Sequence, residues 1–299
     1  MKASSFSPSS VLASLRYLLS DLIGEGDDDE PFLPEGLPET AAAVVSEAIH
    51  RLIEYQGAAY AQLYADRLRR FVGKPGVDDA MFHEIARLMA IRMSYEDIIR
   101  IAQLKLAELE IGHGESGTGS ADDVRKFRFD ELVDVLPAVV AEPLLDALDW
   151  AGWLHKTVPI RFRNSSRLGV RRLKIVASLR RWRRYSVRYA KERVWVERWL
   201  HMIDRSLTKQ PEAASAMVQT ATMVQGYGDV YRQGLADWHL VMDGLAKPTF
   251  DGVLPLRDLA GAVAQARAAA LPDPRQVALK RSIAEIRARV REDSPKPVI

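Results

Sequence analysis

The sequence predicts a mainly α-helical protein, a multi-helix domain with at most one short β element. Apolar residues recur at three- and four-residue intervals along most of the 299 residues, which is typical of amphipathic helices. Only Thr157–Arg163 alternates apolar and polar residues in the manner of a strand. The hydrophobic content of 47% is sufficient for a buried core, and no apolar run reaches the ~20 residues of a membrane-spanning helix.

The N-terminal part is expected to hold the longest helix. Residues 1–39 form an acidic, proline-containing segment that we expect to be disordered apart from a short helix at Val11–Ile23. Residues 40–111 follow as an N-terminal helical part, and the periodicity predicts one continuous helix at Thr40–Phe71.

The next two helices are predicted from their end signals. One is expected at Asp79–Ile91, and the second begins at Ser94 and runs to about Ile111. Serine is a good N-cap, and Glu96 and Asp97 would fill the first turn, where the helix dipole favours acids. We therefore interpret this acidic pair as a helix start and not as a catalytic pair.

A flexible linker at 112–120 precedes a basic C-terminal helical part, 121–292. The helices expected there are Asp130–Val135, Pro137–Trp150, Val170–Arg183, Ser186–Leu207, Pro211–Val224, Asp229–Leu245, Leu256–Leu271 and Pro274–Arg291.

Positive charge is concentrated in one stretch. From Arg161 to Arg198 the chain carries fourteen Arg or Lys and only two acids, a net charge of +12, so the rest carries −10 of the total +2. This asymmetry predicts either a surface for an acidic partner or anion, or a helix pair neutralised by acids elsewhere in the chain. The candidate partner- or anion-binding residues are Arg172, Arg180, Arg181, Arg183, Arg184, Arg188 and Arg193. Trp182, Trp195 and Trp199 are expected in the core, although they could stack on bases.

No catalytic or metal site is recognisable. With zero cysteine, this chain can hold no disulfide, thiolate zinc site or cysteine-ligated cluster, and its six histidines are scattered. We therefore predict no catalytic residue, no metal and no cofactor in this chain, and a cytoplasmic location. An enzyme that binds an aromatic acid among the clustered tyrosines is an alternative.

Four phrases, taken in order, carry a family resemblance: Tyr55-Gln56-Gly-Ala-Ala-Tyr60 with Arg67-Leu68; Arg92-Met-Ser94-Tyr95-Glu96-Asp97; Leu179-Arg-Arg-Trp-Arg183; and Gly226-Tyr227-Gly228-Asp229 with Arg232 and Gly234. Gly226 and Gly228 predict left-handed backbone or a close approach of another segment, and Asp229 is a candidate N-cap. Together the phrases resemble indolepyruvate (arylpyruvate) ferredoxin oxidoreductases. The similar region is the uncharacterised C-terminal helical region of the long beta subunit, and 40–292 would form one such domain.

The resemblance implies a role in a complex that oxidatively decarboxylates arylpyruvates with thiamine diphosphate, iron–sulfur clusters and CoA. The gamma-type catalytic-domain homologue of those subunits has no counterpart in residues 1–39. We therefore predict an accessory or assembly subunit that docks on the catalytic subunit through the basic helices and reaches ferredoxin only indirectly. A helical nucleic-acid or anion-binding module is the alternative, and no membrane partner is expected.

Overall fold

The computed structural model describes residues 35–112, 123–162, 167–270, 273 and 275–292. Within these ranges the protein is mainly α-helical, and its strands are β1 (Asp123–Arg128) and β2 (Thr157–Phe162). They pair antiparallel, with Asp123 opposite Phe162 and Arg128 opposite Thr157. The predicted fold class is confirmed. β2 is the predicted strand, whereas β1 is not among the predicted elements.

The chain divides into two compact units, each assembled from separate stretches of sequence. Unit 1 contains Leu52–Tyr60 and Tyr95–Arg193, and unit 2 contains Ala61–Ser94 and Val194–Ile299 together with residues 35–51. Both units thus combine residues from before and after the predicted linker 112–120, which lies, apart from Gly112, outside the described residues. The predicted helix Val11–Ile23 also lies outside them.

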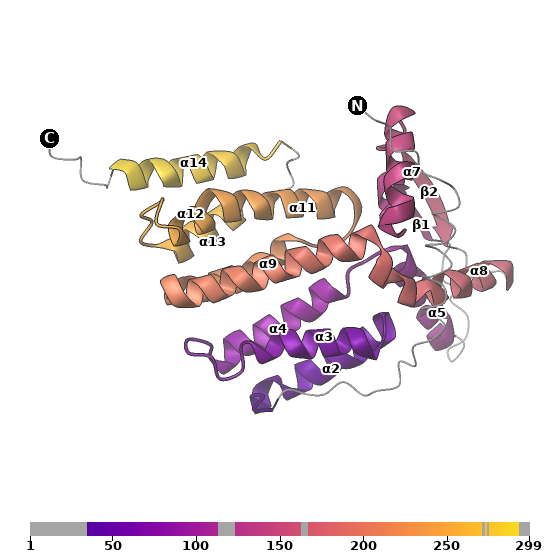
Figure 1. Cartoon of the computed structure of the whole chain (residues 1–299), viewed down its shortest axis with the longest axis horizontal. Helices are drawn as coiled ribbons and strands as arrows, with labels where there is room; N and C mark the ends of the chain where they lie inside the picture. The colour runs from indigo at the N-terminus through magenta and orange to yellow at the C-terminus, as the bar shows by residue number, and fades with distance from the viewer. Residues whose placement is uncertain (1–34, 113–122, 163–166, 271–272, 274, 293–299) are drawn as a thin grey trace. The chain divides into compact units, whose positions relative to one another are not determined.

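Unit 1 is built around α5 (Ile98–Gly112) and α8 (Arg167–Ser178), which pack against each other (Figure 1). The strands contribute Phe127 and Phe162, whose rings meet edge to face with centroids 6.2 Å apart. The unit also contains α6 (Phe129–Val133), α7 (Ala138–Trp150), the 3₁₀ segment η1 (Leu179–Tyr185) and the first turns of α9 (Val187–Lys209).

Unit 2 is all-helical in its described part. Figure 1 shows α4 (Asp79–Met93), the rest of α9, α11 (Gly228–Val241) and α14 (Val277–Glu292) as successive layers. The unit also contains most of α2 (Glu39–Tyr55) and α3 (Ala58–Arg69), then η2 (Pro211–Ala213), α10 (Ala214–Gln219), η3 (Thr220–Met223), the π-helical turn η4 (Met242–Ala246), α12 (Lys247–Phe250) and α13 (Leu259–Ala269).

Buried tryptophans organise the core of unit 2. Trp199 and Trp238 are fully buried, and Trp195 is nearly so. The Trp199 indole N–H donates to the Met217 carbonyl, and the Trp238 indole N–H donates to Thr220 Oγ1, both at 3.1 Å. The predicted core positions of Trp195 and Trp199 are therefore confirmed.

The predicted continuous helix Thr40–Phe71 is wrong, because the chain breaks between α2 and α3. Gly57 has a φ of 137°, a conformation that side-chain-bearing residues rarely adopt. The backbone N–H groups of Gln56 and Gly57 both donate to the Leu52 carbonyl, which closes the end of α2. One glycine thus divides the stretch into two helices.

Ser94 does not cap the helix that follows it, so that prediction is also wrong. Ser94 ends α4, and its hydroxyl donates to the Ala90 carbonyl at 2.8 Å. α5 begins at Ile98, and Asp97 accepts from the Arg100 N–H at 2.6 Å. Asp97 therefore caps α5, three residues after the predicted cap.

Candidate docking surface

The arginine-rich stretch from Arg161 to Arg198 does not form one continuous charged surface. Four of its cations pair with acids among the described residues: Arg183 with Asp97, Arg188 with Glu192, Lys191 with Asp134 and Arg198 with Asp243. The cations of α8 and of the strand before it instead have no ion pair or hydrogen bond to any described residue. They are Arg161, Arg167, Arg171, Arg172 and Lys174. The predicted belt is thus divided into an exposed part and an internally paired part.

Arg183 is predicted to lie on the binding surface, and this is wrong, because its side chain is 0% exposed. Its Nε and Nη2 donate to the two carboxylate oxygens of Asp97 at 2.7 and 2.8 Å. Its Nη1 donates to the Tyr55 carbonyl, and its Cζ lies 3.8 Å from the centroid of the Tyr55 ring. A buried cation is tolerated only when it is paired and hydrogen-bonded, and Asp97 and Tyr55 meet both needs.

Burial also affects the acid–base behaviour of this cluster. Burial by itself would lower the pKa of Arg183, but the electrostatic interactions with Tyr55 and Asp97 outweigh it and raise that pKa. Burial raises the pKa of the Tyr55 hydroxyl well above its usual value, and it does the same for Tyr95. The Tyr55 hydroxyl donates to the Tyr95 carbonyl at 3.0 Å. The cluster is therefore a charged core of unit 1 in which the Arg183 guanidinium and the Tyr55 hydroxyl are hydrogen-bonded, and its tyrosines stay protonated at neutral pH.

The other candidate arginines differ in exposure. Arg184 and Arg188 are half-buried. The guanidinium carbon of Arg184 lies 4.8 Å from the centroid of the Tyr185 ring, and that of Arg188 lies 5.4 Å from the centroid of the Tyr95 ring. Arg180 donates to the Glu54 carbonyl at 3.3 Å. Arg181 and Arg193 make no ion pair or hydrogen bond with a described residue. A partner-binding role stays a prediction for these residues and for Arg172.

An open groove of about 850 Å³ lies between β2 and α8. We call it the β2–α8 groove; it is lined by Ile160, Phe162, Leu168 and Ile175 together with Arg161 and Arg172. Leu168 and Ile175 are 71% and 56% exposed, although both are large and apolar. The groove therefore combines apolar surface with two unpaired guanidinium groups.

The helical repeat explains why α8 presents this surface. Leu168, Arg172 and Ile175 follow one another at intervals of four and three residues, so they form a stripe on one face of α8. Leu173 is the one residue of α8 that is buried. Because the helix needs only that side for packing, the stripe with the arginine in its middle is left exposed.

The family-phrase residues Tyr55, Tyr60 and Tyr95 form an aromatic cluster in unit 1. The Tyr55 ring lies 6.0 Å from that of Tyr60 and 5.7 Å from that of Tyr95. Gln56 is buried beside them, and Glu96 forms an ion pair with Arg125 at 3.6 Å. The tyrosines thus pack against one another, which argues against a tyrosine-lined substrate pocket.

The remaining phrase residues support the packing of unit 2. Arg92 is buried, donates to the Val224 carbonyl at 2.7 Å and places its guanidinium carbon 4.9 Å from the Trp195 ring. At Gly234 an added Cβ would lie 2.0 Å from the Met223 carbonyl oxygen. α11 and the backbone at Met223 therefore approach closely at Gly234, a contact that the sequence did not predict.

The turn before α11 contains both predicted left-handed glycines, since Gly226 and Gly228 have φ values of 69° and 67°. Asp229 is not the N-cap: Tyr227 takes that position without a side-chain bond. Asp229 instead accepts from Arg232 Nη2 at 2.5 Å, one turn along the helix. The prediction of the turn is confirmed, and that of its cap is wrong.

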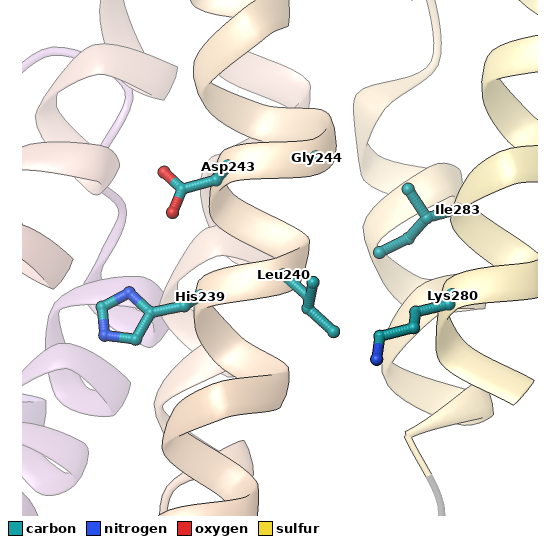
Figure 2. Close-up of a pocket in the computed structure, with 6 residues that line it drawn as sticks. All are labelled: His239, Leu240, Asp243, Gly244, Lys280 and Ile283. Carbon is teal, nitrogen blue, oxygen red and sulfur yellow. The ribbon is translucent and has the colours of Figure 1, made fainter. Parts of the chain in front are cut away.

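A second pocket, of about 240 Å³, lies between α11 and α14 in unit 2. Figure 2 shows His239 of α11 and Asp243 of η4 one turn apart on the same side of the chain, with Leu240 directed toward Lys280 and Ile283 of α14. Arg198 holds both polar groups, with Nη1 2.9 Å from His239 Nδ1 and Nη2 2.6 Å from Asp243 Oδ1. Burial, reinforced by Arg198, lowers the pKa of His239. These polar groups are therefore committed to an internal network.

The described residues form neither a metal site nor a membrane span. No group of three or more His, Asp or Glu side chains is placed to hold a metal ion. No described helix is long and apolar enough to cross a membrane.

Sequence reasoning missed the exposed apolar residues of unit 1. The spacing of Leu168 and Ile175 is the signal for an apolar stripe, but the basic residues around them make the same segment read as a charged surface. α7 was assigned as a helix, but its exposed Val139, Leu144 and Trp150 were not recognised as surface residues. The available signal was the high apolar content of residues 138–150 outside the face that carries Glu142, Asp146 and Asp149, which a partly buried helix would also show.

The β2–α8 groove is thus the best-defined candidate site, and it lies within the region that matches a family of unknown function, DUF6537, over residues 41–244. No curated protein and no solved structure matches the chain. Because the match covers more than half of its residues, the chain belongs to the DUF6537 family.

Proposed function

We propose that this protein is an accessory or assembly subunit of a 2-oxoacid:ferredoxin oxidoreductase and docks on the catalytic subunit through α8. The observation that carries the docking role is the β2–α8 groove, where exposed Leu168 and Ile175 flank the unpaired Arg172. Contiguous exposed apolar surface commonly marks an interaction site. Charged groups at such a surface favour a partner of opposite charge and speed the encounter.

The identity of the proposed complex rests on the four sequence phrases that resemble indolepyruvate ferredoxin oxidoreductases. Most residues of these phrases support packing: Asp97 with Arg183 in unit 1, and Arg92 and Gly234 in unit 2. The phrases are therefore suited to specifying a fold that is shared with the helical region of those enzymes.

In this proposal the chemistry belongs to the partner. Thiamine diphosphate, the iron–sulfur clusters and CoA are bound by other subunits, ferredoxin is reached through them, and the complex is cytoplasmic. This chain contributes binding energy and orientation at the surface of the catalytic subunit.

The test is co-purification of the full chain with the thiamine-binding catalytic subunit. The variant R171E/R172E/K174E reverses three exposed cations of α8 and should abolish association. The matched control K209E/K247E/R257E makes the same change in net charge at three exposed cations of unit 2 and should associate normally. Failure of the wild type to associate, or equal behaviour of the two variants, would refute the proposal.

A nucleic-acid-binding module is the second candidate, favoured by the same unpaired cations. Trp195 and Trp199 are buried and so cannot serve as the stacking platform that such binding would use. Binding to DNA or RNA that weakens steeply as salt rises, and that is lost in R171E/R172E/K174E, would favour this function. Absence of binding at low salt would eliminate it.

A further inference from the structure

α7 is the most apolar exposed helix of unit 1. Ala141 is the one residue of its thirteen that is buried. Val139 and Leu144 are exposed, and Trp150 at the C-terminal end is 92% exposed. An indole with nearly all of its surface in water is unusual outside a binding surface.

The charges of α7 all have the same sign. Residues 138–150 contain Glu142, Asp146 and Asp149 and no basic residue, a net charge of −3. The three acids are exposed and form no ion pair or hydrogen bond through their side chains to any described residue. Their spacing of four and three residues places them on one face of the helix.

α8 has the complementary pattern. Its Arg167, Arg171 and Lys174 are also spaced by four and three residues and are also exposed and unpaired within the described chain. The adjacent stripe contains Leu168 and Ile175 and lines the β2–α8 groove. In both helices the three charges span about 10 Å along the axis, given a rise of ~1.5 Å per residue.

We propose that the occupant of the β2–α8 groove in the isolated protein is α7 of a second copy of this chain. The three acids of α7 face the three cations of α8, and Val139 and Trp150, on the side of α7 next to the acids, cover the apolar stripe that includes Leu168 and Ile175. Because every copy carries both helices, two copies related by a two-fold axis make this contact twice. The pairing satisfies six charges per contact and removes apolar surface from water.

This inference goes beyond the docking function and does not depend on it. The catalytic subunit and a second copy would use the same face of α8, so the two associations exclude each other. Self-association can be measured on the isolated chain, and its outcome is therefore distinguishable from that of the co-purification experiment.

Sedimentation velocity on the full chain over a wide range of concentrations tests the proposal. The wild type should sediment as a dimer or larger assembly that dissociates on dilution and with added salt. R167E/R171E/K174E and, separately, E142K/D146K/D149K should each weaken association about tenfold or more. A wild type that stays monomeric at the highest concentration would overturn the proposal.

The mixing experiment separates specific pairing from misfolding. Each triple variant alone presents two helices of like charge and should be mostly monomeric at a concentration where the wild type is dimeric. In an equimolar mixture, the acidic α8 of one variant meets the basic α7 of the other, and the remaining contact keeps its original charges. A dimer should therefore form in the mixture at a total concentration where each variant alone is monomeric. Absence of a dimer in the mixture would overturn the proposal.

Two other occupants give different results. If the acidic residues Asp27-Asp-Asp-Glu30 of the same chain occupied the groove, the wild type would be monomeric and D27N/D28N/D29N/E30Q would self-associate. If only an acidic partner protein occupied the groove, the wild type and D27N/D28N/D29N/E30Q would both be monomeric. Acrylamide quenching of tryptophan fluorescence provides a second measure. Trp150 should become protected from acrylamide in the dimer, and this protected component should be missing in W150F.

Discussion

Unit 1 and unit 2 differ in how completely they bury large apolar side chains. Unit 1 holds nine of the fourteen exposed large hydrophobic residues in the described chain, including both exposed tryptophans. Four of the five in unit 2 are valines. Scattered exposed valines are ordinary, whereas exposed leucine, isoleucine and tryptophan are more typical of interaction surfaces. Unit 2 thus buries nearly all of its largest apolar side chains, and unit 1 leaves several exposed, as the proposed docking requires.

The contrast also divides the arginines within unit 1. Arg172 and Arg183 lie in the same basic stretch, but one is exposed at a groove and the other is fully buried against Asp97. An arginine-rich sequence therefore does not by itself define a binding surface. The position of one acid, 86 residues away in sequence, decides which arginine is structural.

The largest expected effect on stability comes from breaking the buried ion pair between Arg183 and Asp97. Arg183→Met should lower the free energy of unfolding by about 3–5 kcal/mol, because it leaves the Asp97 carboxylate buried without its counterion. Chemical denaturation measures the loss. The control Arg172→Met should not change stability measurably, since that side chain is exposed and unpaired. Equal effects of the two substitutions would contradict the division between internal and surface arginines.

The next effect tests how closely unit 2 is packed. Gly234→Ala should destabilise the protein by about 1–3 kcal/mol, because the new Cβ would overlap the Met223 carbonyl and force the backbone to shift. The reverse change on the exposed side of the same helix, Ala236→Gly, should cost no more than about 1 kcal/mol from helix propensity. If Gly234→Ala were tolerated as well as the control, the close approach of η3 to α11 would be incorrect.

Local sequence features were enough to predict the helices but not their interruptions or their partners. Amphipathic periodicity identified α4, α9 and α14, and glycine correctly marked the turn at Gly226 and Gly228. The prediction from periodicity failed at Gly57, because a single glycine inside a long periodic stretch is also compatible with an unbroken helix.

The candidate site was predicted less completely, for a physical reason. Arg172 and Arg183 are both predicted as binding residues because they lie in the same basic stretch, but only Arg172 is exposed. Only the three-dimensional position of Asp97 separates them, and local charge counting cannot supply a contact between residues so far apart in sequence. The same holds for α7, whose apolar composition fits a buried helix as well as an exposed one.

Alkaline titration should report the buried tyrosines. Because burial raises the pKa of Tyr55 and Tyr95 in the folded state, their contribution to stability is full below the unfolded pKa of about 10 and is lost as pH rises through the folded values. Absorbance of tyrosinate should therefore show these groups ionising together with unfolding. Tyr55→Phe should cost about 1 kcal/mol at neutral pH by removing the bond to the Tyr95 carbonyl, and this deficit should shrink above pH ~10. A deficit that does not change with pH would contradict the assignment.

The smallest effect on stability should come from the open side of unit 1. L168S/I175S should leave the thermal melting temperature essentially unchanged, because both side chains are mostly in water in the isolated chain. It should nevertheless reduce the binding of an apolar dye such as ANS and weaken any association that uses the β2–α8 groove. Leu173→Ser on the same helix is the matched control: that side chain is buried, so its loss should cost about 2 kcal/mol or more. If L168S/I175S destabilised the protein as much as Leu173→Ser, the stripe would belong to the core of unit 1, and the difference between the two units would disappear.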